Sequence, residues 1–100
     1  MPPENKIEDA VCAFAISVGM LSYKFVSPSN RGVPDRIFLY RGHAMFIEFK
    51  RTGKIALDPL QEVVGKKFAA NGFIVQVCND IQEGNSMILA FRDGVDNVKP

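Results

Sequence analysis

The stretches RGVPDRIFLY (residues 31–40) and MFIEFK (residues 45–50) decide the fold, because each contains the β-branched and aromatic residues typical of a β-strand. We expect one strand over Arg36–Tyr40 and another over Ala44–Arg51. Arg41-Gly42-His43 lies between them and predicts a tight turn. The two strands are therefore expected to pair as a hairpin.

The polar residues of the second stretch follow the two-residue period of a strand. Because successive side chains of a strand point to opposite faces, Glu48 and Lys50 are expected on one face and the apolar residues 45, 47 and 49 on the other, toward a core. Asp35 precedes the first strand, and counting back from the turn places it roughly opposite Glu48. Two carboxylates and an ammonium group at one sheet edge are the parts needed to hold Mg²⁺ beside a phosphate and to activate a water molecule.

Helical spacing, strand alternation and cap residues predict the remaining elements. We expect a helix from Glu4 to about Gly19, a strand over Leu21–Val26, a helix from Pro59 to about Ala70 with Asp58 as its N-cap, a strand over Phe73–Val77 in the sheet interior, and a last helix that starts at Asp80 and has a frayed polar tail from Asp93. The order αβββαβα predicts the α/β class, with a mixed sheet flanked by helices.

The composition predicts one domain over residues 1–100. Hydrophobic residues make up 47% of the chain, which is enough for a compact core. No apolar run reaches the roughly 18 residues of a membrane span, and the N-terminus lacks the apolar segment of a signal peptide. Cys12 and Cys78 stand far apart without a CxxC pattern, so no disulfide is expected. We therefore expect a cytoplasmic protein that does not bind a membrane.

The net charge of +1 is low for a protein that binds nucleic acid, but the cations are concentrated in the middle of the chain. Taken alone, each of these cations is better explained as a solvated surface charge. The candidate phosphate contacts are Lys24, Arg31, Arg36, Arg51, Lys54, Lys66 and Lys67. A bound divalent cation would add positive charge where the phosphate docks. His43 belongs to the predicted turn, which is the wrong end of the hairpin for a catalytic base beside the carboxylates.

The three polar residues of the hairpin also have purely structural explanations. Glu48 and Lys50 could face water on the polar side of a strand, and Asp35 could be an ordinary turn residue after Pro34. Two carboxylates placed opposite each other repel unless a cation lies between them. Their expected proximity therefore favours a metal site over the structural explanation.

Two residues outside the hairpin are further candidates. A glutamate in the first turn of a helix is favoured by the helix dipole, which explains Glu8 without a function; its apolar neighbours also allow a half-buried side chain that binds metal through water. Gln61 stands three residues after Asp58 and predicts a capping box. That role competes for the same amide with contacts to water or phosphate.

Taken together, these residues resemble the VRR-NUC domain of the PD-(D/E)XK nuclease superfamily, which has the restriction-endonuclease-like fold. The resemblance rests on Glu8, the run Arg31–Asp35, the run Ile47–Lys50 and Gln61, in that order. Each motif alone is common, whereas the four in this order are fairly specific. The resemblance covers roughly Glu4 to Cys78, and the last helix is compatible with it.

The resemblance implies a restriction-endonuclease-like core that hydrolyses DNA phosphodiester bonds with Mg²⁺ or Mn²⁺. The implied metal ligands are Asp35, Glu48, the backbone carbonyl of Phe49 and, completing the metal's surroundings, Glu8. Lys50 would be the catalytic lysine, and Gln61 the glutamine of the helix that follows. The implied contacts to DNA are Lys24, Arg31, Arg36, Arg51 and Lys54.

Small stand-alone members of this family, from phages and bacteria, resemble homodimeric Holliday-junction resolvases. The chain has little room for accessory DNA-binding domains, so we expect a homodimer that places two sites on one four-way junction, in a bacterial or phage-infected cell. One alternative is a module that binds branched DNA without cutting it. Another is a flap or restriction nuclease, although little loop remains to read bases in a major groove.

Overall fold

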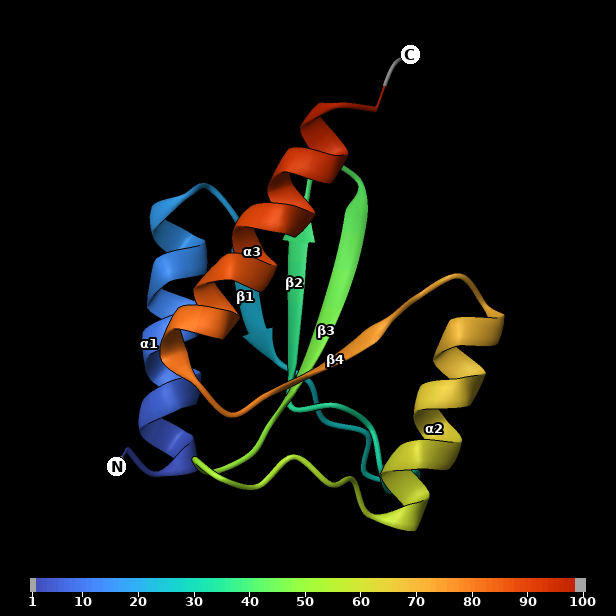
Figure 1. Cartoon of the computed structure of the whole chain (residues 1–100). Coiled ribbons are helices and arrows are strands. Elements are labelled where there is room, and N and C mark those ends of the chain that lie inside the picture. The colour runs from blue at the N-terminus through green and yellow to red at the C-terminus, as the bar shows by residue number, and fades with distance from the viewer. Residues whose placement is uncertain (1, 99–100) are drawn as a thin grey trace.

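The computed structural model describes residues 2–98, which form three helices and one four-stranded sheet (Figure 1). The elements are α1 (Glu4–Ser17), β1 (Leu21–Lys24), β2 (Arg36–Tyr40), β3 (His43–Phe49), α2 (Pro59–Ala70), β4 (Val75–Cys78) and α3 (Ile81–Asp96). The strand order is β1-β2-β3-β4, with antiparallel pairs except for the parallel pair β3–β4. The predicted order αβββαβα and the mixed α/β sheet are confirmed.

The β2–β3 hairpin sets the register of the sheet. Its turn consists of Arg41 and Gly42, whose φ angles of 46° and 82° are both positive, as the favoured two-residue hairpin turns require. Tyr40 then pairs with His43, so His43 begins β3 rather than belonging to the turn. Arg36 pairs with Ile47 at the other end of the hairpin.

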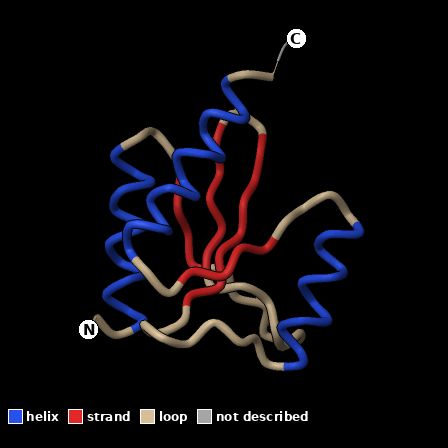
Figure 2. Tube along the Cα trace, in the orientation of Figure 1, coloured by secondary structure: helices blue, strands red, loops and turns tan. Residues whose placement is uncertain are grey.

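The helices cover the two faces of the sheet unequally. Helices α1 and α3 pack against each other on one face, whereas α2 lies apart from them on the other (Figures 1 and 2). The first face carries the core, whose fully buried side chains include Ile7, Val11, Phe38, Ile47, Phe49 and Ile88. None of the described helices is long and apolar enough to cross a membrane.

An aromatic cluster attaches α2 to the second face. Phe46 of β3 lies with its ring centroid 4.9 Å from that of Phe68 in α2, 5.3 Å from that of Phe25 and 5.9 Å from that of Phe73. Edge-to-face contacts of this kind add to the burial of apolar area. No residue of α2 is buried, so this cluster supplies much of the attachment of the helix. The even positions of β3 therefore face α2.

The loop before β2 is pressed against the first turn of α2. Gly32 has a φ angle of +89°, and a Cβ atom at this position would lie 2.7 Å from the backbone oxygen of Leu60. Glycine thus allows a positive φ angle and a close backbone approach at once. The contact brings the residues before β2 to the N-terminal end of α2.

Two predicted features of the C-terminal half are wrong. Helix α3 continues to Asp96 instead of fraying from Asp93, because the Asp96 carboxylate accepts hydrogen bonds from Tyr40 Oη at 2.9 Å and Arg41 Nη1 at 3.1 Å. Strand β4 lies at the edge of the sheet rather than in its interior, since within residues 2–98 it pairs only with β3. An apolar run indicates buried faces but not how many neighbours a strand has.

Both cysteines are free and buried, and Cys78 lies at a close contact between α3 and the sheet. Gly84 of α3 is buried above it, and a Cβ atom on Gly84 would lie 2.8 Å from Cys78 Sγ and 2.5 Å from Val11 Cγ2. A glycine inside a helix is unfavourable by helix propensity alone. In the structure, its missing side chain lets α3 approach α1 and β4.

Gly84→Ala should therefore destabilise the fold, by about 1–3 kcal/mol in chemical denaturation, because the new methyl group overpacks a rigid core. Gly94→Ala on the same helix is the control, since nothing lies within 4 Å of its Cβ position. Removing a helical glycine there should raise the free energy of unfolding by up to about 1 kcal/mol. Equal effects of the two substitutions would contradict the close packing at Gly84.

Candidate active site

A pair of carboxylates lies where β2 begins and β3 ends. Because Arg36 pairs with Ile47 in the antiparallel register, the preceding Asp35 falls opposite Glu48. The Asp35 carboxylate accepts a hydrogen bond from the backbone N–H of Phe49, with 2.8 Å between Oδ2 and N. This bond holds Asp35 against the end of β3, as the residue count from the turn predicts.

Glu48 is buried on the α2 side of the sheet, with 5% of its surface exposed. Its Oε2 accepts a hydrogen bond from Gln61 Nε2 and lies 3.5 Å from Lys50 Nζ. Its Oε1 is buried and has no hydrogen-bond partner. Burial, with the nearby Asp35 carboxylate, raises the pKa of Glu48 to about 7, although Lys50 and Gln61 act in the opposite direction.

Lys50 is as buried as Glu48, with 7% of its surface exposed. Its backbone N–H donates to the carbonyl of Cys78 at 2.8 Å, which extends the β3–β4 pairing by one residue and sets the direction of the side chain. The carbonyl of Cys78 is a supporting group that the sequence could not reveal, since the register of parallel strands depends on tertiary packing. The explanation that Glu48 and Lys50 face water is wrong.

Gln61 joins the catalytic candidates to the start of α2. Its Oε1 accepts from the backbone N–H of Asp58 at 3.0 Å and from Lys50 Nζ at 2.9 Å, while its Nε2 donates to Glu48. The capping role and the site role were expected to compete. They do not, because a primary amide offers an acceptor and donors on separate atoms.

The carboxylate pair suits a hard divalent cation. An unpartnered, buried carboxylate oxygen is costly, and a second carboxylate beside it adds repulsion that a cation would relieve. Among residues 2–98, no three His, Cys, Asp or Glu side chains form a metal-binding group. A cation here would therefore take the two carboxylates together with a backbone oxygen such as that of Phe49, ligands that Mg²⁺ accepts.

The structure does not bring Glu8 to this pair. Its Oε2 accepts from Arg36 Nε at 2.6 Å and from Lys24 Nζ at 3.1 Å. Arg36 pairs with Ile47 and shares its face of the sheet, under α1, whereas Asp35 and Glu48 lie on the α2 face. Glu8 is buried as expected. It was expected beside the metal, but in the structure it contacts the side chains of Lys24 and Arg36 instead.

The predicted DNA contacts divide into two groups. Lys24 and Arg36 are held by Glu8, and the Arg36 side chain is only 20% exposed. Arg31, Arg51 and Lys54 are exposed and lie in the two loops that precede β2 and α2. Because the loop before β2 touches the first turn of α2, these loops border the end of the sheet that holds Asp35 and Glu48.

Comparisons with known proteins bear on this site. No protein-family model matches the chain. Its sequence is 42% identical over 52 residues to a protein named "Putative nuclease p44" from Acyrthosiphon pisum secondary endosymbiont phage 1; the matched segment is 51% of this chain and 56% of that protein, so the comparison spans about half of each. A solved structure described as "VRR_NUC domain" superposes with a TM-score of 0.80, covering 88% of this chain and 96% of that chain at 24% identity. The chain has the fold of a VRR_NUC domain.

The raised pKa of Glu48 predicts that the metal-free protein loses stability as the pH rises. The carboxyl group holds its proton up to about pH 7 in the fold, but only to its ordinary value of 4.5 when unfolded. The stability that the protonated Glu48 adds to the fold is therefore fully present below pH 4.5 and is lost as the pH rises through 7. The glutamine side chain of the Glu48→Gln variant cannot ionise. In EDTA, the free energy of unfolding of this variant, relative to that of the wild type, should therefore rise by about 2–3 kcal/mol from pH 5 to pH 8.

The measurement is urea denaturation at several pH values. Glu62→Gln is the matched control, because Glu62 is exposed on α2 and its variant should follow the wild-type profile. Parallel profiles for Glu48→Gln and wild type would show that the folded state does not hold this proton.

Proposed function

We propose that the chain is a metal-dependent nuclease that hydrolyses DNA phosphodiester bonds at the site formed by Asp35, Glu48, Lys50 and Gln61. The observation that carries the proposal is the buried, unpartnered Glu48 Oε1 beside the Asp35 carboxylate. The shared fold with a VRR_NUC domain and the similarity to a phage protein named as a nuclease support it.

Asp35, Glu48 and the backbone carbonyl of Phe49 would hold the cation, which we propose to be Mg²⁺ or Mn²⁺. Such a cation, when bound, supplies Lewis acidity to a phosphate and lowers the pKa of a bound water. The hydrogen bond from the Phe49 N–H keeps Asp35 in place for this role. Glu48 presents its free Oε1 while Oε2 stays bonded to Gln61.

Lys50 is the proposed catalytic lysine. Its Nζ would orient the attacking water or offset the negative charge that develops on the phosphate. Gln61 accepts a hydrogen bond from this Nζ and so fixes the ammonium group beside Glu48. The capping bond from Asp58 in turn fixes the Gln61 amide. Positioning of this kind contributes to catalysis because the groups need no rearrangement during the reaction.

The proposed substrate is branched DNA, in particular a four-way junction cut by a homodimer in a bacterial or phage-infected cell. The exposed Arg31, Arg51 and Lys54 beside the site suit contacts with backbone phosphates. Arg36 and Lys24 would contribute from the α1 side of the sheet, and Glu8 is proposed to position both through its two hydrogen bonds.

The low net charge of +1 favours keeping a second candidate, a module that binds branched DNA without cutting it. The two functions differ in their need for a cation. A binding module would hold DNA equally well in EDTA and would never nick it. A flap or restriction nuclease would differ from a junction resolvase only in the DNA that it cuts.

Purified protein should cut a labelled four-way junction at paired positions in Mg²⁺ or Mn²⁺, and should cut neither a matched duplex nor any DNA in EDTA. Lys50→Ala should lower the cleavage rate at least about 100-fold, because it removes the charge that faces the phosphate. Lys6→Ala, at an exposed lysine of α1, is the matched control and should cleave like wild type.

Circular dichroism should show that the Lys50 variant remains folded. Asp35→Asn should also lose Mn²⁺ binding measured by calorimetry, which tests the cation site without reference to activity. Full cleavage by folded Lys50→Ala would overturn the mechanism. A metal-independent gel shift without cleavage would favour the binding module, and cleavage of flaps or of specific duplex sites would replace the junction as substrate.

A further inference from the structure

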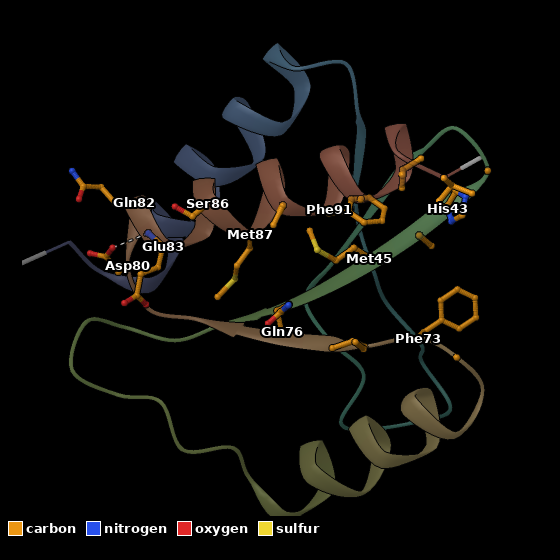
Figure 3. A pocket seen from close by; sticks show the side chains of 18 residues that line it. His43, Met45, Phe73, Gln76, Asp80, Gln82, Glu83, Ser86, Met87 and Phe91 are labelled. Carbon is orange, nitrogen blue, oxygen red and sulfur yellow. Dashed lines mark hydrogen bonds between the residues drawn. The ribbon is translucent and has the colours of Figure 1, made fainter. Parts of the chain in front are cut away.

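A groove of about 1210 Å³ lies between α3 and the strands β3 and β4. Figure 3 shows Met45, Met87 and Phe91 pointing into it, with Gln76 on its floor. The groove is on the α3 side of the sheet, whereas Glu48 and Lys50 face α2. It is therefore separate from the candidate active site.

The outer edge of β4 borders this groove. Within the described residues β4 pairs only with β3, so its other edge presents backbone N–H and C=O groups that no strand satisfies. Proteins commonly protect such edges by keeping the strand short or by placing charged residues or proline on it. Strand β4 is short, at four residues, but it reads Val-Gln-Val-Cys and contains neither a charged residue nor proline. The residues that lead into it, Phe73 and Ile74, are 43% and 67% exposed. This edge is a template for a further strand.

We propose that the β4 edge and the groove form the interface with a second copy of this chain, and this inference rests on the homodimer of the proposed function. The two β4 strands pair antiparallel about a two-fold axis, as an isologous contact requires. The line along which the two β4 strands pair is the seam of the dimer. The α3 helices then meet across this seam, and each covers the groove of the other copy.

The helices are needed because the strands alone bury too little surface. A stable interface removes about 800 Å² per partner, against a total accessible surface of 6336 Å² for this chain. Strand β4 contains only four residues. The apolar side chains of α3, Met87 and Phe91, supply additional area on the same side of the sheet.

The groups at the two ends of the groove complement each other under this symmetry. Asp80 and Glu83 lie at one end and His43 at the other (Figure 3). An antiparallel arrangement brings the acidic end of one copy to the imidazole of the second copy, twice. A parallel arrangement would oppose like ends, with carboxylates facing carboxylates.

The same symmetry also suits two active sites on one DNA. An axis perpendicular to a continuous sheet leaves both α2 helices on the same face of the dimer. Glu48 pairs with Val77 of β4, so each site lies one strand from the seam. Both sites would therefore face one branched DNA from the same side.

The test is sedimentation equilibrium over a range of protein concentrations. Wild type should sediment at twice the 11.1 kDa of one chain, and Ile74→Lys should weaken the dimer at least about 100-fold by placing a charge at the seam. Ile16→Lys is the matched control, because Ile16 lies on α1 outside the groove and is 60% exposed. It should dimerise like wild type.

Ala90→Lys supplies a second variant within the groove, at an exposed helix position, and should also give monomers. Wild type that remains monomeric would overturn the proposal, as would a dimer that survives both groove variants. Lys50→Ala should remain dimeric, which separates the interface from the chemistry. A dimer that depends on the groove but does not cleave DNA would support this interface and overturn the nuclease.

Discussion

Groups from β3, α2 and the loop before β2 meet at the buried Glu48 carboxylate. A carboxylate removed from water is costly unless charge and hydrogen bonds compensate, and each compensating group comes from a different element. The two compensating groups are Lys50, directly after β3, and Gln61, in the first turn of α2. Asp35, which repels Glu48, enters from the loop that touches α2 and is held by the N–H of Phe49. The end of the sheet, the first turn of α2 and the loop before β2 are therefore held by one electrostatic arrangement. That arrangement leaves Glu48 Oε1 without a hydrogen-bond partner.

The sequence predicts those parts of the site that depend on local geometry. The two-residue period of β3 and the tight turn before it place Asp35 opposite Glu48 without knowledge of the remaining chain. The burial of Glu48 could not be predicted in this way, since a polar strand face reads the same whether water or a helix covers it. The partners of Glu8 were missed for a similar reason, because α1, β1 and β2 contribute one group each.

The same distinction holds for the fold. The order and class of the elements follow from periodicity and cap residues, and they are confirmed. The edge position of β4 and the last turn of α3 depend on contacts between residues distant in sequence, such as Tyr40 with Asp96. Gly84 is the clearest case. Helix propensity counts it as a defect, whereas the packing of α3 against Val11 and Cys78 requires the absence of its side chain.

The Gln61 amide has a consequence for how this chain can diverge. Position 61 needs an acceptor that receives two N–H groups and a donor that reaches Glu48, all on one side chain. Glutamate has the reach but lacks the donor, and it would place a third negative charge among the carboxylates. Asparagine has both groups but is one methylene shorter. The capping bond alone needs only an acceptor, which glutamate would also supply, so the bond to Glu48 is what favours glutamine over glutamate at this position. A homologue without a carboxylate at position 48 should therefore accept either residue at position 61 and keep its helix cap.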